Sequence, residues 1–415
     1  MTLEKYSLGI GDRFGMEGVA QLRALQKAAE HGVAVVPVWN KSHREHSIIG
    51  TDPEDTLRAA AAAVHAAAWT KPFYLDADHI GLATLDKFIV PCNFFTIDVA
   101  DVIGRAADRR SASAFLKTVR PFRGTLAIPG MRAPITVDDA LLQAVADKYL
   151  LAVIEAGKVY RRIIANRDGQ SFVVEMSLDE ADFPQSPAEL FFILAAAARE
   201  GIPLQTIAPK FTGDFLKGID YVGDISRFES EFRDHLAVVN RAITEFSLPV
   251  NLKLSVHTGS DKFSLYPVIR SAIRDFDAGL HLKTAGTTWL EEVIGIAGHG
   301  GEALLLAKEL YALAFTRYDE LCKPYATVVR IDRSHLPDPA EVELWTAVQY
   351  VEALRHDQTC PGYNKDFRQF VHVSFRIAAE MGERYLAMLR ECRSTIEQNV
   401  TSNLYDRHLK PLFVG

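Results

Sequence analysis

Short apolar segments recur along the first 283 residues, and each one ends at polar side chains that are capable of chemistry. The segments are rich in β-branched and aromatic residues and are apolar at both odd and even positions. This pattern favours strands of a parallel sheet that is covered on both faces. The segments are Tyr6–Gly11, Val33–Val38, Phe73–Leu75, Phe94–Ile97, Phe172–Met176, Leu204–Ile207, Asn251–Val256 and Leu280–Leu282.

Helical patterns separate these segments. Glu17–His31 stops at Gly32 and Pro187–Glu200 stops at Gly201, and a glycine is a common residue just past the end of a helix. Alternation of strands and helices predicts right-handed βαβ units. Eight strands with polar groups at their carboxyl ends predict a (β/α)8 TIM barrel, a fold whose active site lies at that end. We therefore expect an α/β enzyme.

Two regions depart from this alternation. About 70 residues separate the fourth strand from the fifth, and Val137–Arg167 within them is amphipathic. That length is too great for a loop and predicts a helical insertion, at about residues 99–170, over the barrel mouth. After residue 300 the patterns are helical. We expect residues 1–300 to form the catalytic barrel and residues 301–415 a helical region that packs on it, since no linker divides them.

Composition and charge argue against several classes of function. A chain of 415 residues at 48% hydrophobic content can bury a large core, and a net charge of −7 argues against a nucleic-acid partner. No apolar helix reaches the roughly 18 residues of a membrane span, and the N-terminus lacks the pattern of a signal peptide. The four cysteines form no CxxC pair, so we expect a reduced, cytoplasmic protein.

The sharpest pair of polar residues is Asp78 and His79, which end the third strand. An imidazole at a strand end can hold a divalent ion while a neighbouring carboxylate serves as a base. The structural alternative is a helix-capping aspartate beside a surface histidine, but Asp76 adds a third polar group to what should be buried strand. Asp98 ends the fourth strand and is either a buried structural acid or a catalytic group.

A second group of candidates follows the seventh and eighth strands. His257 precedes Gly259 and Ser260, so it lies beside backbone N–H groups at a helix start, which bind anions readily. His281 has the same strand parity as Lys283 and is expected to neighbour His257. Two imidazoles with carboxylates suit zinc, nickel, manganese or a similar ion. Asp179 or Glu180 of the fifth strand can complete such a site, with Glu175 deeper on the parity of Asp179.

Basic residues also gather at strand ends. Several cations at one mouth of an acidic protein predict an anionic substrate. These cations are Lys41, Arg44, Lys210, Lys262 and Lys283.

The glycine-rich segment Gly9–Gly15 follows a strand and precedes a helix, as a dinucleotide loop does. However, Asp12 would face the pyrophosphate, and the second strand ends in Asn40-Lys41 instead of an acid. We therefore expect no nucleotide cofactor, and we expect the glycines to present Asp12 and Arg13 to the mouth. His372 is structural in isolation, but a C-terminal helix folded over the mouth can bring it to the site.

The chain resembles the tagaturonate epimerase family, metal-dependent enzymes that interconvert tagaturonate and fructuronate, while Trp39–Ile49 departs from the family's pattern. The resemblance implies a divalent metal and a small sugar-acid substrate. The residues that carry it are Ser7–Gly15 (SLGIGDRFG), Asp76–His79 (DADH), Phe95–Asp98 (FTID), Gly218–Asp224 (GIDYVGD), His257–Tyr266 (HTGSDKFSLY), His281–Thr287 (HLKTAGT) and Arg368–His372.

In this interconversion the inverted carbinol is β to the ketone, so enolisation alone cannot invert it, whereas retro-aldol cleavage followed by re-addition can. The Asp78-His79 pair is similar to the arrangement in class II aldolases, where the histidine holds the metal and the aspartate moves the proton. We predict His79, Asp179, His257 and His281 as metal ligands. Asp78, Glu175 and Asp98 are the predicted catalytic carboxyl groups. The predicted substrate-binding residues are Asp12, Arg13, Lys210, Ser260, Asp261, Lys262, Lys283 and His372.

Three alternatives remain open at this point. The chain can be a metal-dependent aldolase that releases its fragments, or an enzyme that oxidises its substrate transiently with tightly held NAD. From another class, it can be a sugar-acid binding barrel without catalysis. The sequence leaves the oligomeric state open, a homo-oligomer included.

Overall fold

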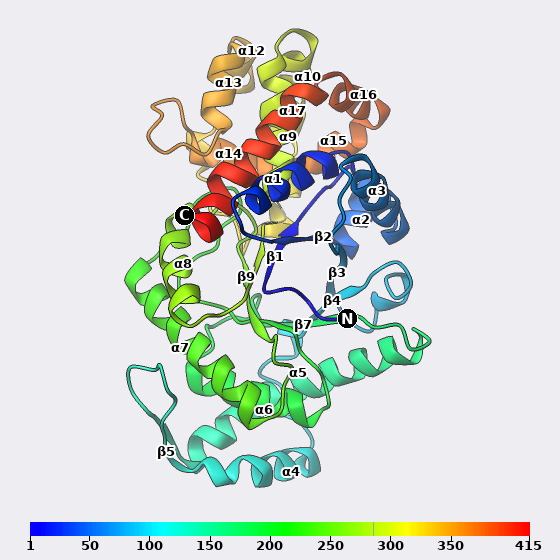
Figure 1. Cartoon of the computed structure of the whole chain (residues 1–415). Helices are drawn as coiled ribbons and strands as arrows, with labels where there is room; N and C mark the ends of the chain where they lie inside the picture. The colour runs from blue at the N-terminus through cyan, green and yellow to red at the C-terminus, as the bar shows by residue number, and fades with distance from the viewer. Residues whose placement is uncertain (285) are drawn as a thin grey trace.

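Eight parallel strands close into a barrel in the order β1-β10-β9-β8-β7-β4-β3-β2 (Figure 1). The computed structural model describes residues 1–284 and 286–415, so Ala285 of the predicted His281–Thr287 motif lies outside the described residues. The closed parallel barrel confirms the predicted (β/α)8 fold. Its strands are β1 (Tyr6–Ile10), β2 (Val36–Ser42), β3 (Tyr74–Ile80), β4 (Phe94–Asp98), β7 (Val173–Ser177), β8 (Thr206–Ala208), β9 (Lys253–His257) and β10 (Leu280–Lys283).

Helices form the outer layer of the barrel and a C-terminal region. The outer helices are α1 (Gly18–Glu30), α2 (His43–Ile49), α3 (Pro53–Ala66), α4 (Arg109–Val119), α5 (Asp139–Ala165), α6 (Pro187–Arg199), α7 (Ile225–Glu245), α8 (Tyr266–Asp275) and α9 (Thr287–His299). The C-terminal helices are α10 (Gly301–Thr316), α11 (Tyr318–Cys322), α12 (Pro339–Glu343), α13 (Ala347–Leu354), α14 (Lys365–Val373), α15 (Phe375–Met381), α16 (Glu383–Glu391), α17 (Arg393–Ser402) and a terminal π-helix, Asn403–Val414.

Local sequence starts several of these helices. Ser186 accepts a hydrogen bond from the backbone N–H of Glu189 and Glu189 returns one, which is a capping box, and Pro187 occupies the first turn of α6. Asp224 caps α7 in a similar way through two backbone N–H groups. Among the described residues, none of the helices combines the length and apolar character that a bilayer crossing needs.

The two ends of the barrel interior differ in polarity. Side chains of a small apolar cluster fill the amino-terminal end, namely Leu3, Val36, Val38, Tyr74, Phe94 and Val173. The N-terminal segment closes this end, since Lys253 Nζ donates to the carbonyl oxygens of Leu3 (3.3 Å) and Glu4 (2.6 Å). Polar chemistry is therefore left to the carboxyl ends of the strands.

Strands β2 and β3 run further than the apolar pattern predicts. β2 continues through Asn40 and Lys41, and β3 continues through Asp76 to His79. The side chains of Lys41 and Asp76 find partners inside the barrel mouth, so the backbone ladder need not end where the apolar residues end. The register of β3 against β4 shifts between Ala77 and Ile80. His79 there has φ 51°, a left-handed conformation that non-glycine residues rarely adopt and that often marks functional sites.

The sequence predicted that the insertion after β4 covers the barrel mouth and that the C-terminal helices pack on the barrel. The insertion consists of α4, a short hairpin of β5 (Gly124–Leu126) and β6 (Ile135–Val137), and α5. α5 lies in the outer layer against α4 and α6, away from the C-terminal helices (Figure 1). The mouth is instead covered by α14 and α15, because Arg368 of α14 contacts Gly218 and Asp261, and α15 contacts α2. The C-terminal region thus packs on the barrel, on the side where the strands end.

Candidate active site

A dense group of charged side chains lies at the carboxyl ends of five strands. We call it the strand-end cluster. It comprises Asp76, Asp78, His79, Asp98, Glu175, Asp179, Glu180, His257 and Lys283. Six carboxyl groups therefore share the space with one lysine and two imidazoles, which makes the mouth of the barrel strongly negative.

Lys283 is the central cation of the cluster. Its Nζ lies 2.8 Å from Asp76 Oδ2, 2.5 Å from Asp78 Oδ1 and 3.0 Å from Thr96 Oγ1. Burial alone would lower the pKa of Lys283, but Asp76, Asp78 and Glu175 raise it well above its usual value. Burial raises the pKa of Asp76 to about 6, against the opposing effect of Lys283. The lysine is therefore fully charged, and its ammonium group already lies against three protein oxygens.

His257 is held between two carboxyl groups. Its Nε2 lies 2.8 Å from Glu175 Oε1 and its Nδ1 lies 3.1 Å from Asp179 Oδ2, although the second contact is poorly angled for a hydrogen bond. Burial opposes protonation, yet Asp179 and Glu175 raise the pKa of His257 to about 9. The same contact holds the pKa of Asp179 well below its usual range despite burial.

His79 faces the same space from the bulged end of β3. Its Nδ1 lies 3.1 Å from Asp98 Oδ2, and its ring centroid is 5.4 Å from that of His257. Burial would lower the pKa of His79, but Asp78, Asp179 and Asp98 raise it to about 10. The bulge therefore brings Asp78 and His79, which are adjacent in the chain, to one side of the barrel. This outcome agrees with the expected orientation of the pair.

Two sets of residues in the cluster have the spacing of metal ligands. Donor atoms of His79, Asp179 and His257 lie within 4.8 Å of one another, and so do those of His79, Asp98 and Glu180. Nitrogen and carboxylate oxygen suit several divalent ions, whose bonds of about 2 Å place ligand atoms some 3–4 Å apart. Glu175 Oε2 and His257 Nδ1 are buried, and neither has a hydrogen-bond partner among residues 1–284 and 286–415. The residues thus fit a divalent ion chemically.

His281 lies one layer deeper in the barrel. The register pairs Lys283 with His257 but pairs His281 with Ser255, and two residues span about 6–7 Å of a strand. His281 Nδ1 is 2.9 Å from Ser7 Oγ and its ring packs against Phe94. Burial lowers the pKa of His281 to about 3. Among the described residues it belongs to neither set of possible ligands, so the structure does not bring it to His257 as the sequence suggested.

Several predicted substrate-binding residues have donors or acceptors that are already used. Asp12 accepts from the backbone N–H groups of Gly15, Met16 and Glu17 and so shapes the turn before α1. Lys210 Nζ donates to the carbonyl of Ala181. Their interactions hold loops at the mouth.

The ammonium group of Lys262 also donates to protein oxygens. Its Nζ, which has three donors at most, serves Leu216 O (2.9 Å), Ser260 Oγ (3.2 Å) and Asp261 O (3.1 Å). Ser260 Oγ also accepts from the backbone N–H of Gly218. Burial lowers the pKa of Lys262 to about 7. Lys262 and Ser260 thereby join the loop after β8 to the loop after β9.

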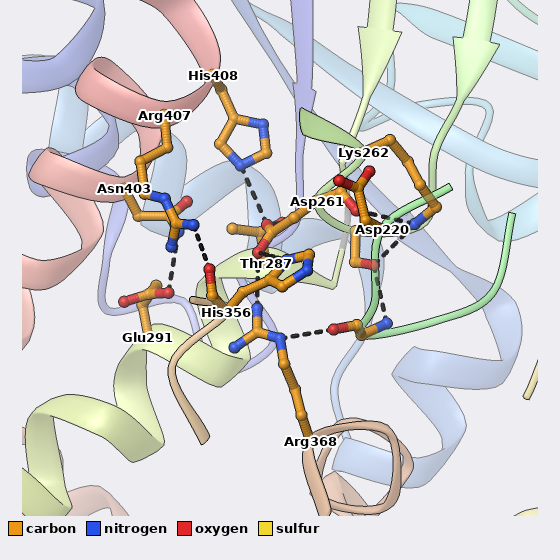
Figure 2. A network of polar contacts seen from close by, with 12 residues as sticks. Asp220, Asp261, Lys262, Thr287, Glu291, His356, Arg368, Asn403, Arg407 and His408 are labelled. Carbon is orange, nitrogen blue, oxygen red and sulfur yellow. Dashed lines mark hydrogen bonds and ion pairs between the residues drawn. The ribbon is translucent and has the colours of Figure 1, made fainter. Parts of the chain in front are cut away.

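Asp261 is the centre of a second buried network, which we call the Asp261 network (Figure 2). Its Oδ2 accepts from Arg368 Nη2 (2.7 Å) and His356 Nδ1 (3.1 Å), and its Oδ1 accepts from Thr287 Oγ1 (2.9 Å) and His408 Nε2 (3.1 Å). Burial would raise the pKa of Asp261, but Arg368 and the two histidines hold it well below its usual range. This carboxylate ties three C-terminal segments to the barrel.

Arg13 and His372 differ from the other predicted substrate-binding residues because they retain unused polar atoms. Arg13 Nη1 and both ring nitrogens of His372 are buried without hydrogen-bond partners in the described structure. No sequence pattern pointed to Lys217 itself, whose Nζ lies 3.8 Å from the position of a Cβ at Gly259, near His372. Lys217 follows β8 in the stretch before α7, and the unusual length of that connection was a signal for a functional loop.

The closed barrel and the acid-rich strand-end cluster define the class of the protein as a TIM-barrel enzyme. The family model described as UxaE, tagaturonate epimerase, matches residues 1–411. The chain therefore belongs to the tagaturonate epimerase family, whose members are isomerases.

Individual relatives agree with this assignment. A tagaturonate/fructuronate epimerase of Thermotoga maritima is 28% identical over 97% of this chain and 80% of its own length. Crystal structures of the fructuronate-tagaturonate epimerase UxaE of Cohnella laeviribosi share the fold. The native form has TM-score 0.81 at 24% identity, over 99% of this chain and 82% of that chain. A glycerol complex has TM-score 0.82 at 23% identity over the same shares.

Proposed function

We propose that this protein is a metal-dependent epimerase that interconverts the keto-hexuronates tagaturonate and fructuronate by retro-aldol cleavage and re-addition. One observation carries the proposal. In a member of this family, His79, Asp179 and His257 converge at the mouth of the barrel with ligand atoms close enough to share one ion, and Asp78 lies beside His79. The Thermotoga relative, named for this activity, supports the choice of substrate.

The proposed ion is held by His79, Asp179 and His257, with Asp98 and Glu180 as nearby carboxyl groups. Such an ion, when bound, would supply Lewis-acid polarisation of the substrate ketone. The surrounding acids favour cation binding, because they already raise the pKa of both imidazoles. A metal that takes the place of those protons needs neutral imidazoles, so its affinity should rise with pH.

Asp78 is the proposed proton acceptor for the hydroxyl on the inverted carbon. Lys283 keeps this carboxyl group ionised, since its Nζ lies 2.5 Å from Asp78 Oδ1 and the pKa of Asp78 is lowered despite burial. As the hydroxyl proton moves to Asp78, the bond between the third and fourth carbons breaks. Its electron pair passes toward the ketone, which leaves an enediolate and an aldehyde. Re-addition to the other face of the aldehyde inverts the centre and takes the proton back from Asp78.

Purified protein incubated with tagaturonate or fructuronate under several divalent ions tests this proposal. We expect either uronate to yield a mixture of both, detected by chromatography or NMR, and we expect chelation to abolish turnover reversibly. Full turnover after exhaustive chelation would contradict the metal requirement. Accumulation of a free aldehyde would instead indicate an aldolase that releases its fragments.

A further inference from the structure

We propose that Arg13, Lys217 and His372 form an anion site beside the strand-end cluster and that it binds the carboxylate of the sugar acid. The inference rests on the proposed function and names the residues that bind the carboxylate, at the end of the substrate furthest from the ketone. Predicted candidates for that carboxylate included Lys262 and Lys283, but protein oxygens already surround both ammonium groups.

Arg13 follows β1 and is only 6% exposed. Its guanidinium stacks over the ring of Phe375 of α15, 4.0 Å from the ring centroid, and its Nε lies 3.4 Å from Glu45 Oε1. In the part of the chain that the structure describes, Nη1 has no hydrogen-bond partner. A buried guanidinium with an unused donor is costly unless an acceptor arrives, and Arg is the residue best suited to a carboxylate.

Lys217 approaches from the loop after β8. The loop is held by a hydrogen bond from Lys217 N to Val328 O (2.8 Å), and the Lys217 ammonium lies 5.7 Å from the ring centroid of Tyr325. Within the described residues no carboxyl group lies within 4 Å of this ammonium. Burial lowers the pKa of Lys217, and Arg13 lowers it further. An anion between these two cations would relieve both effects.

His372 of α14 completes the site. It is 1% exposed, and neither ring nitrogen has a partner among the described residues. Its Nε2 lies against Gly286, where a Cβ would collide with it, and the carbonyl of Gly259 is close to the same point. A Cβ at Gly259 would lie 3.8 Å from Lys217 Nζ. The two glycines therefore leave room for Lys217 and His372 at the ends of β9 and β10.

The anion site is adjacent to the proposed metal ligands. Gly259 follows the proposed ligand His257 by two residues, and Lys217 Nζ lies 3.8 Å from the position that a Cβ at Gly259 would take. The substrate carries its ketone on the second carbon and its carboxylate on the sixth. With the ketone at the strand-end cluster, the carboxylate would reach toward Lys217.

An anchored carboxylate solves a problem that retro-aldol epimerisation creates. Cleavage between the third and fourth carbons leaves the carboxylate on the aldehyde fragment, which must stay bound while it presents its other face. Rotation about the bond between the fourth and fifth carbons achieves this while the carboxylate stays fixed. The anion site is therefore a specificity determinant and also keeps the fragment from escaping.

Lys217→Met in the full-length protein tests the inference. We expect kcat/KM for tagaturonate and fructuronate to fall about 10- to 150-fold, the usual contribution of a hydrogen bond to a charged group. Binding of D-glycerate, a small carboxylate that resembles the fragment, should weaken by a similar factor in calorimetry. Lys217→Arg should recover part of both losses, and Lys71→Met, which removes an exposed lysine, should change neither.

The outcomes separate this inference from the proposed function. If Lys217→Met binds D-glycerate as the parent protein does and keeps its kcat/KM for uronates, the anion site is wrong while the epimerase assignment stands. If the parent protein epimerises no uronate under any ion, the proposed function is wrong. Calorimetry decides the anion site in that case too, because it requires no turnover.

Discussion

The strand-end cluster and the Asp261 network are both buried groups of acids, histidines and cations, yet they differ in how their polar atoms are used. Asp261 accepts four hydrogen bonds, and Arg368 also donates to the carbonyl oxygens of Gly218 and Leu354 (Figure 2). In the strand-end cluster, acids outnumber cations, and Glu175 and His257 keep buried atoms without partners. A charged group whose polar atoms all bind other protein groups holds segments of the chain together. A charged group that keeps polar atoms without partners can bind a ligand.

The two groups also differ in what they connect. Every member of the strand-end cluster comes from a barrel strand or from the turn just after it, so the barrel alone positions them. Asp261 instead joins the turn after β9 to residues 356, 368 and 408, far along the chain. The first arrangement serves chemistry at the mouth, and the second fastens the helices that cover it.

The largest expected effect is the loss of turnover on removal of a proposed ligand. His257→Ala should lower kcat by about 10³-fold or more, because Lewis-acid stabilisation is worth several kcal/mol, and it should also lose bound divalent ion. The variant should remain folded, since the barrel and the Asp261 network persist. Turnover, metal content after dialysis and circular dichroism measure these three effects.

His65→Ala is the matched control, since His65 is exposed on α3 and belongs to neither group. It should keep parental turnover and metal content. An active His257→Ala protein with unchanged metal content would remove the strand-end cluster from the reaction.

The Asp261 network should respond in the opposite way, through stability. Asp261→Asn keeps the shape of the side chain but leaves Arg368 buried without its counter-charge, which we expect to lower the free energy of unfolding by about 3–5 kcal/mol. Urea denaturation measures the loss. Glu383→Gln, which breaks an exposed ion pair with Arg390, should cost under about 1 kcal/mol. Equal stability of Asp261→Asn and the parent would show that the network does not fasten the C-terminal helices.

Sequence reasoning found the strand-end cluster well because its signals are local. An apolar strand that ends in Asp78-His79 or His257 predicts both the strand and the direction of its polar end. Whether a polar atom has a hydrogen-bond partner depends, in contrast, on residues far away in the sequence. Asp261 and Lys262 look like site residues in sequence, but Arg368, 107 residues away, and Leu216 use their polar atoms.

The depth of a side chain in the barrel could not be predicted from the sequence either. His281 has the expected parity, but the register with Ser7 and Ser255 sets it one layer below the mouth. The bulge that turns His79 inward follows from the pairing of β3 with β4, which no single strand encodes. The coverage of the mouth by α14 and α15, and so the place of His372 beside Lys217, also depends on contacts between distant segments.

Lys253 is a buried cation outside both groups. Its effect on the free energy of unfolding is the smallest that we expect. Lys253 lies at the closed end of the barrel without an acid partner, and burial lowers its pKa from 10.5 to about 7. Between pH 7 and 10.5 the unfolded chain holds this proton and the folded protein does not, so stability rises with pH in that window, by at most about 1.4 kcal/mol per pH unit. Below pH 7 both states are protonated and this contribution to the slope vanishes. Urea denaturation of the parent and Lys253→Met at pH 7, 8 and 9 should show a shallower rise for the variant. If the free energy of unfolding changed with pH in the same way for the parent and the variant, Lys253 would stay charged in the folded protein. Burial without an acid partner would then not be enough to remove its proton.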